Sequence, residues 1–488
     1  MKRNLGRLTE LDRLIEPMLN AARIPGAAIA IIMGGDIVFS RGYGYRDLAS
    51  RLPANSKTIY PIASTTKAIN ATLLGMLVDD GRLQWDAPVQ DYLPRFRLID
   101  PIASSHVTIR DLITMRTGLP RHDWMWMAHP ISRAELVERL RYLEVSAGLR
   151  ERFQYTNLTV IASGHIAEVV AGQTWEDLVR ERLFKPLGMT ATGFELPVAG
   201  DVTSSYHENP QHELVLTRRF ATGDSGPSGG SIHSNVEDMA RWMAFNLSDG
   251  SAGGTSLIQA HTLRDIHSPC VVVGAVPESI SPNCAYGCGW FLDTYNGQGR
   301  VSHSGYLFDV NSDIALFPQE GIGIVSFTNF GFPRFSRFIN EHAFDLIMGL
   351  NPVQTLETKL VQNENRRKRD RECSPTARRA KGTLPSHRAE DYAGSYEHPA
   401  YGAIRIHVHD SELVLQRDQL SLPLEHWHYD VWFVRESDVM TTHEPYLFDQ
   451  ANRLMFESDA DGEISAVLIR LEPVVAPVRF RKSRACAG

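Results

Sequence analysis

The chain has 488 residues, of which 43% are hydrophobic and 22% charged, and its formal net charge is -7. This length and composition are typical of a soluble globular protein of two to four domains with a large core. The negative charge argues against nucleic acid as the main partner, because nucleic-acid binders concentrate basic residues on one surface.

The N-terminal segment Met1–Pro17 contains several acidic residues and lacks the apolar stretch of a secretory signal. No run of 18 apolar residues occurs in the sequence, so no membrane-spanning helix and no membrane partner are predicted. Five cysteines in so long a chain do not indicate a disulfide framework. We therefore expect a cytoplasmic protein.

The first 250 residues predict mainly helices, with one hairpin near the start. Apolar residues at helical spacing predict an N-terminal helix over Leu8–Ala22. Two β-rich runs separated by Gly-Gly-Asp then predict a hairpin, with strands at Ala27–Met33 and Ile37–Tyr43. Further helices are predicted at Ser64–Asp80, Tyr155–Val170, Trp175–Leu187 and Asn235–Asn246.

Strand patterns return later in the chain. Four short β-rich runs are separated by turn residues, at Tyr286–Leu292, Gly299–Ser304, Val310–Phe317 and Ile322–Thr328. One sheet is therefore built from both ends of the first 350 residues, with helices contributed by the middle. This order is typical of an α+β fold and not of a βαβ series.

The composition changes after the last of these strands. Residues 355–388 are basic and polar around Arg366–Arg369, which predicts a solvated linker. A tail that binds nucleic acid or an acidic partner is the less favoured alternative, because no aromatic residues interleave for stacking. From Tyr392 to Arg481 apolar residues alternate, which predicts an antiparallel barrel or sandwich. The predicted division is a first domain at 1–354, a linker at 355–388 and an all-β domain at 389–488.

The first candidate for chemistry is Ser64, which lies three residues before Lys67 at a predicted helix start. Residues at this spacing share a helix face, and the helix N-terminus stabilises a developing anion. A serine hydroxyl needs a base, and a lysine can be that base only if burial or a nearby cation lowers its pKa. On its own, however, the motif is more often a serine that caps the helix.

Two further motifs add candidates. Tyr155 and Asn157 are two residues apart at another predicted helix start, and both can face a cleft. His303 and Gly305 lie at the end of a predicted strand, where a glycine lets a ligand approach the strand edge. Taken singly, an asparagine cap with a packed tyrosine is the favoured explanation of the first pair, and a core or surface histidine is the alternative for His303.

In order and spacing, the three motifs together resemble those of the serine β-lactamase and penicillin-binding-protein superfamily, in particular its class C and D-aminopeptidase/esterase branch. Other segments match the same branch, namely Ile24–Ile29, Thr108–Ile113, Arg116–Pro120, Phe184–Met189, Gly229–Gly230 and Tyr286–Trp290. The resemblance covers residues 8–350 and implies an antiparallel sheet flanked by helices, with an all-helical subdomain. The segments Asp391–Tyr396, Pro399–Gly402 and His426–Asp430 resemble the lipocalin-like barrel that is fused to some of these hydrolases.

The resemblance implies that Ser64 forms an acyl-enzyme while Lys67 and Tyr155 transfer its proton. Asn157 would orient Lys67 and bind the substrate amide. The backbone N–H groups of Ser64 and Tyr306 would form the oxyanion hole, next to His303 and Gly305. The implied reaction requires no cofactor and no metal.

One motif departs from the β-lactamase pattern. His303 stands where those enzymes carry a lysine that binds the free carboxylate of the substrate. A neutral imidazole holds a carboxylate less strongly near pH 7. Efficient β-lactam hydrolysis and cell-wall transpeptidation are therefore not expected.

The favoured function is a serine peptidase or amidase that acts on small peptides or D-amino-acid derivatives. The alternatives are an esterase or acyltransferase for small molecules such as secondary metabolites, and a non-catalytic penicillin-binding-like sensor. The expected partner is the substrate alone, and the sequence does not predict the oligomeric state. The pairs His407/His409 and His426/His428 could chelate zinc only if they lay on adjacent strands, and the interpretation as packing or exposed histidines is favoured.

Overall fold

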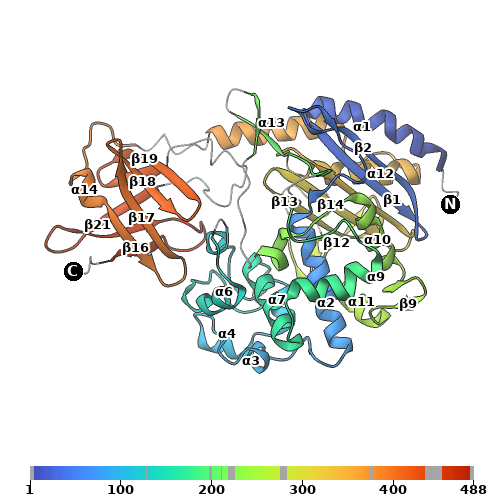
Figure 1. Ribbon diagram of the computed structural model, residues 1–488, viewed down its shortest axis with the longest axis horizontal. Coiled ribbons are helices and arrows are strands. Elements are labelled where there is room, and N and C mark those ends of the chain that lie inside the picture. Colours follow the sequence, from blue (N-terminus) through green and yellow to red (C-terminus); the bar gives the residue numbers. More distant parts are fainter. Residues whose placement is uncertain are drawn as a thin grey trace.

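The computed structural model describes residues 5–127, 129–196, 200–209, 212–217, 226–274, 283–332, 334–372, 379–434 and 453–483. Within these ranges the chain forms an α+β body and a closed β-barrel, as the sequence predicts. In Figure 1 the barrel lies to the left of the α+β body, and the nearest labelled helix of the body is α6 (Arg133–Arg139).

The α+β body is built on a nine-stranded antiparallel sheet, counted over the described residues. Its middle is formed by strands from both ends of the body, because β1 pairs with β15. In sheet order the strands are β10 (Val271–Val272), β11 (Ala285–Tyr286), β12 (Phe291–Tyr295), β13 (Gln298–Leu307), β14 (Val310–Phe317), β15 (Ile322–Thr328), β1 (Gly26–Met33), β2 (Asp36–Asp47) and β3 (Leu52–Pro53).

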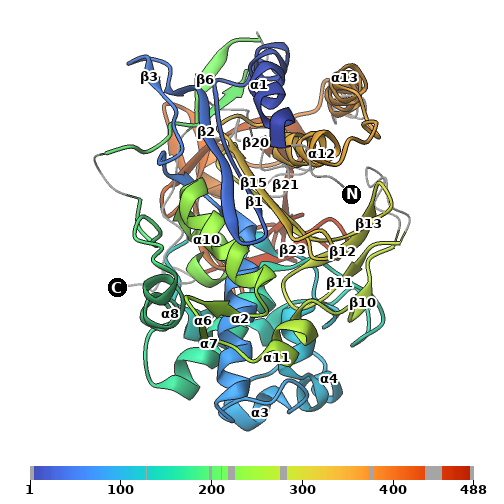
Figure 2. The same ribbon diagram turned by 90° about the vertical axis from the view of Figure 1, so that its right-hand side faces the viewer.

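Helices cover both faces of this sheet (Figure 2). One face packs against α1 (Leu8–Ala22) and α12 (Phe335–Met348), and the other against α10 (Val236–Leu247) and α2 (Thr66–Asp79). Successive side chains of a strand point to opposite faces, so both faces of β1 must be apolar. Its sequence, Gly-Ala-Ala-Ile-Ala-Ile-Ile-Met, meets this requirement and is buried throughout.

Helix α2 is buried on all sides, from Thr66 to Leu77, which is the pattern of a helix enclosed within a core. It packs against α7 (Asn157–Ala171) and α11 (Ala260–Ile266). The other helices of the body are short. They are α3 (Val89–Tyr92), α4 (Pro101–His106), α5 (Ile109–Ile113) and α8 (Trp175–Val179). Helix α8 continues through a π-helical turn into α9 (Lys185–Leu187).

One sequence prediction needs correction. The run Tyr286–Leu292 is not one strand, because Gly289 adopts φ +75° between β11 and β12. That backbone lies against Lys67 O, where a side chain would not fit, so the turn is fixed by packing onto α2. The predicted solvated linker includes a helix, α13 (Leu356–Glu372), none of whose described side chains is buried.

The barrel contains eight antiparallel strands over the described residues, closed by pairing of β16 with β23. Short helix α14 (Ala389–Tyr392) precedes it, and buried side chains such as Tyr396 and Phe480 fill its interior. The strands are β16 (Gly394–His398), β17 (Gly402–His409), β18 (Glu412–Arg417), β19 (Leu420–His428), β20 (Val431–Val434), β21 (Arg453–Ser458), β22 (Ile464–Ile469) and β23 (Val478–Lys482).

The histidine pairs of the barrel do not meet the condition for a zinc site. His407 and His409 lie on β17, whereas His426 and His428 lie on β19, and β18 separates the two strands. In the described part of the chain, no three His, Cys, Asp or Glu side chains gather in a way that could hold a metal ion. Among the same residues, none of the helices has the length and apolar character needed to cross a bilayer.

Candidate active site

Ser64 lies in a tight turn at the start of α2. A 3₁₀ turn (Ala63–Thr65) follows the short strand β4 (Tyr60–Pro61) and runs directly into the helix. Ala63 has a φ of +50°, which costs a non-glycine residue about 1–2 kcal/mol. Strand β13 lies against this turn at Gly305, where a Cβ atom would overlap with Ile62 O. The glycine therefore allows the strand and the serine turn to approach closely.

Lys67 lies one turn further along and reaches Ser64 directly. Its Nζ is 2.9 Å from Ser64 Oγ, 2.7 Å from Asn157 Oδ1 and 2.6 Å from the Gly229 carbonyl oxygen. The lysine is completely buried, and this burial lowers its pKa well below the usual 10.5. The nearby Arg121 guanidinium lowers the pKa further, while the Asp123 carboxylate acts in the opposite direction.

The surroundings of Nζ match a neutral amine. A neutral lysine carries two N–H bonds and one lone pair, whereas an ammonium carries three N–H bonds. Asn157 Oδ1 and Gly229 O can only accept, so they take the two N–H bonds. In the neutral form, the third position of Nζ is its lone pair, which faces Ser64 Oγ and can accept the hydroxyl proton; in the ammonium form, Nζ donates to Ser64 Oγ instead. A general base that activates a serine hydroxyl needs a contact of this length.

Tyr155 lies beside this group. The centre of its ring is 5.1 Å from Lys67 Nζ and 5.0 Å from the guanidinium carbon of Arg121. Its ring is also 6.4 Å from the ring of His303. The phenol is thus brought close to two basic side chains, from a segment about 90 residues away in the sequence.

His303 is buried and its two ring nitrogens have partners inside the protein. The Nδ1 atom is 2.7 Å from Ser304 O, and since a carbonyl only accepts, Nδ1 carries the proton. Nε2 then accepts from the Tyr286 hydroxyl at 3.2 Å. Burial lowers the pKa of His303 to about 3. The imidazole is therefore neutral at physiological pH, as the sequence interpretation requires.

Three residues of this group were not predicted from the sequence. Gly229 accepts from Lys67, Asp123 accepts from the Asn157 amide at 2.8 Å, and Arg121 pairs with Asp123 at 2.6 Å. Gly229 lies in a glycine-rich turn that the sequence makes visible, but its carbonyl role depends on the fold. Asp123 and Arg121 directly follow the matching segment Arg116–Pro120, which is the one local indication of their place.

Among the predicted site residues, Ser64, Lys67 and Asn157 form one hydrogen-bonded group, and Tyr155 and His303 border it. Gly305 packs on the serine turn, and the next residue, Tyr306, donates its hydroxyl proton to Asp309 at 2.5 Å. The catalytic and binding roles assigned to these residues remain predictions.

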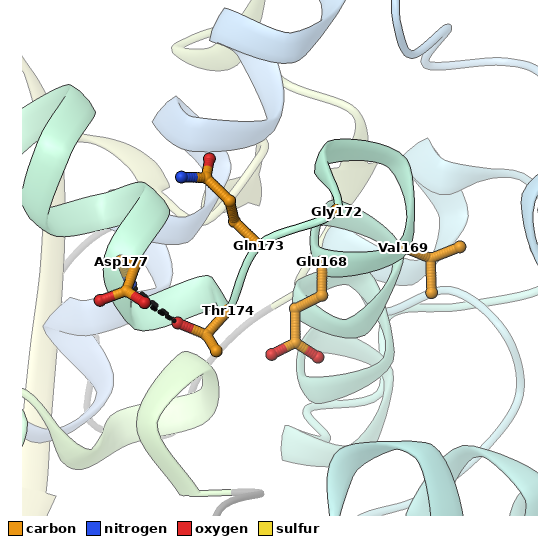
Figure 3. Close-up of a pocket in the computed structure, with 6 residues that line it drawn as sticks. All are labelled: Glu168, Val169, Gly172, Gln173, Thr174 and Asp177. Atoms are coloured by element: carbon orange, nitrogen blue, oxygen red, sulfur yellow. Dashed lines mark hydrogen bonds between the residues drawn. The ribbon is translucent and has the colours of Figure 1, made fainter.

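A separate hollow lies at the junction of α7 and α8 (Figure 3). It is lined by Glu168, Val169, Gly172, Gln173, Thr174 and Asp177. Its Thr174 hydroxyl donates to Asp177 at 2.8 Å, and Glu168 accepts from Arg133 at 3.2 Å, so its polar groups serve helix capping and ion pairing. None of the predicted site residues lines it.

Comparison with known proteins identifies the family. Residues 11–346 match the family model described as beta-lactamase. The chain belongs to the β-lactamase family. This is a family of serine hydrolases, and the serine turn described above lies within the matched residues. Residues 378–482 match a second model, a domain of unknown function called DUF3471, which spans the barrel.

The chain is also similar to individual proteins. It is 27% identical over 439 residues to a protein of Aspergillus campestris named unguisins hydrolase. The aligned residues cover 84% of this chain and 79% of that protein. It is 28% identical over 368 residues to Protein flp of Staphylococcus aureus, with 72% and 69% covered. Its fold resembles that of the octameric penicillin-binding protein homologue from Pyrococcus abyssi, at a TM-score of 0.64 and 22% identity, covering 97% of this chain and all of that one.

Proposed function

We propose that the chain is a serine amidase or peptidase that acts on small peptides or D-amino-acid derivatives through an acyl-enzyme on Ser64. The observation that carries this proposal is the buried Lys67, whose Nζ lies 2.9 Å from Ser64 Oγ. A buried amine whose pKa is lowered, in contact with a serine hydroxyl, is the arrangement expected of a base that accepts the hydroxyl proton.

In the proposed acylation step, Ser64 Oγ attacks the substrate carbonyl carbon and its proton passes to Lys67 Nζ. The electron pair of the carbonyl π bond moves onto oxygen, where the backbone N–H groups of Ser64 and Tyr306 donate to it. Each such donor contributes about 3–4 kcal/mol to the stability of the transition state. The close packing of Gly305 on the serine turn supports this pairing of donors.

The tetrahedral intermediate then expels the leaving amine and leaves the acyl group on Ser64. An amine leaves only when it is protonated, and the proton held on Lys67 passes to it directly or through the Tyr155 phenol. An alcohol leaves more readily than an amine without being protonated first. The presence of two side chains that can carry the proton, Lys67 and Tyr155, therefore supports an amide substrate. Water repeats the sequence in reverse and releases the acid. The name of the A. campestris relative, a hydrolase, supports water as the final acceptor.

The neutral, buried His303 supports substrates that bind without a free carboxylate. Both of its ring nitrogens are engaged by Ser304 and Tyr286, so it offers no charge to an anion. We propose that it forms part of the wall of the acyl site together with the Tyr155 ring. Blocked peptides and amides are therefore expected to react better than substrates with a free α-carboxylate.

The second candidate is an esterase or acyltransferase, since the same group would also cleave an ester. A matched panel of p-nitroanilides and p-nitrophenyl esters, with D- and L-aminoacyl groups, separates the two. Turnover of the anilides is expected for the wild type and not for Ser64→Ala. If only esters turn over, the amidase proposal is wrong. If a fluorophosphonate probe does not label Ser64, the interpretation as a non-catalytic sensor takes its place.

A further inference from the structure

One end of the barrel holds a short segment of the α+β body next to the active site. The Tyr401 hydroxyl is 2.6 Å from His122 Nδ1, and the His122 backbone N–H donates to Glu472 at 3.0 Å. Arg417 donates to the Trp124 carbonyl oxygen at 2.6 Å. The three barrel residues come from the β16–β17 turn, the end of β18 and the turn after β22. In an antiparallel barrel these positions lie at the same end.

These contacts are buried and chemically specific. Tyr401, Arg417, Glu472 and His122 each expose 4% or less of their surface. His122 Nε2 lies 2.8 Å from Glu144 O, so it carries the proton and Nδ1 accepts from Tyr401. The Arg417 guanidinium also lies over the Trp124 ring, at 4.8 Å from its centre. Burying an arginine is costly unless it is bonded, so this is a built interface and not a chance contact.

The residue between the two held positions, Asp123, reaches into the catalytic group. Its Oδ1 accepts from Asn157 Nδ2 at 2.8 Å and from Trp126 Nε1 at 2.9 Å. Its Oδ2 accepts from Arg121 Nε at 2.6 Å. The barrel therefore holds the residues on either side of Asp123, and three successive hydrogen bonds run from Asp123 through Asn157 and Lys67 to Ser64.

The Asp123 carboxylate determines which way the Asn157 amide faces. An ionised carboxylate only accepts hydrogen bonds, so it selects the NH₂ group of the amide. Asn157 Oδ1 must then face Lys67 and accept one of its N–H bonds. With the amide reversed, its NH₂ group would meet the lysine N–H bonds, and the lone pair of Nζ would no longer be held toward Ser64.

We propose that Asp123 is a positioning residue for Asn157 and Lys67, and that the barrel holds it there through Tyr401, Arg417 and Glu472. The barrel is thus a working part of the catalytic centre and not an independent appendage. This inference rests on the proposed function, because it takes Lys67 as the base of Ser64.

The first test uses the pH dependence of Ser64 phosphonylation by a fluorophosphonate probe, measured on the full chain. Asp123→Asn is expected to lower the limiting rate about tenfold, because the amide of Asn157 loses its fixed direction. It should also move the acid limb to lower pH, since the carboxylate raises the pKa of Lys67. Arg121→Gln should move the limb to higher pH, since the guanidinium lowers that pKa. Shifts in the same direction, or none, would overturn the role of Asp123.

The second test concerns the barrel and compares two Tyr→Phe variants, each of which loses only the tyrosine hydroxyl group. Tyr401→Phe removes the bond to His122, whereas Tyr396→Phe removes a bond of 2.7 Å to Tyr392 O inside the barrel. Tyr401→Phe is expected to lower the limiting phosphonylation rate about fivefold without changing probe affinity, and Tyr396→Phe to leave both unchanged. Equal rates for the two variants would overturn the role of the barrel.

Two substitutions of Glu472 provide a second test of the barrel in case Tyr401→Phe disturbs folding. Glu472→Gln keeps an acceptor for the His122 N–H and should retain the wild-type rate, whereas Glu472→Met should lose several-fold. Equal rates for these two count against the inference. A wild type in which Ser64 is not labelled contradicts the proposed function itself. Labelling that depends on Lys67 but not on Tyr401 or Glu472 contradicts only the inference.

Discussion

Replacing Lys67 with methionine should change stability in a way that depends steeply on pH. Burial lowers the pKa of Lys67 in the folded state, while in the unfolded chain it returns to about 10.5. Between these two values the unfolded state binds one more proton than the folded state. The free energy of unfolding of the wild type therefore rises with pH through this window, by about 1.4 kcal/mol per pH unit.

Lys67→Met has no titrating group at this position, so the variant should lack this slope, and the slope should appear in the difference between the variant and the wild type. As the pH rises from 8 toward 10, the wild type should gain stability relative to the variant, by at most about 1.4 kcal/mol per pH unit. The variant also leaves Asn157 Oδ1 and Gly229 O without the lysine donor, but that cost does not change with pH. The slope thus isolates the buried amine from the lost hydrogen bonds.

The assay is urea unfolding of the full chain at pH 8, 9 and 10, followed by tryptophan fluorescence. Lys57→Met removes an exposed lysine and is the matched control, for which the difference from wild type should stay constant. If Lys67→Met also runs parallel to the wild type, Lys67 keeps its proton when folded. The neutral-amine account of the active site would then be wrong.

Three other perturbations test the same centre. Tyr155→Phe and Lys67→Ala should each lower turnover of an active anilide by about 100-fold or more. The double variant should be little worse than either single variant, because removing one member of a group that acts as a unit already loses most of the activity. Additive losses would contradict the shared role. Gly305→Ala should lower both the melting temperature and the labelling rate, since its Cβ would overlap with Ile62 O, and unchanged values would mean that β13 does not press on the serine turn. Asp313 is fully buried and its pKa is raised from 3.8 to about 6, so its contribution to stability is present below pH 4 and lost as the pH rises through 6. Asp313→Asn should therefore gain about 2 kcal/mol relative to the wild type between pH 4 and pH 7, and equilibrium unfolding that shows no gain would refute the shift.

Local periodicity was sufficient to predict most of the fold. The helix at Leu8–Ala22 matches α1 residue for residue, because its apolar positions and the Pro25–Gly26 break are both local signals. The hairpin and the alternating strands of the barrel were equally clear. The run Tyr286–Leu292 was misjudged, because its break at Gly289 arises from packing against a helix more than 200 residues earlier in the chain.

The candidate site could be predicted only as far as its motifs are contiguous. Ser64 and Lys67 lie on one helical turn, so their contact follows from spacing alone. Asp123 appears in the sequence as one more acidic residue, and nothing local pairs it with an amide 34 positions later. The same holds for Arg417, whose partner Trp124 lies 293 positions away in another part of the fold. Such contacts are set by how the barrel docks, and no local pattern encodes that.

The central claim is that Ser64 is the nucleophile and that neutral Lys67 activates it. Peptide mapping of the chain after reaction with a fluorophosphonate probe tests it most directly. We expect the label on the peptide that contains Ser64 in the wild type, at a rate that falls as the pH is lowered through the pKa of Lys67. Label on another residue, or equal labelling of Ser64→Ala, would contradict the account.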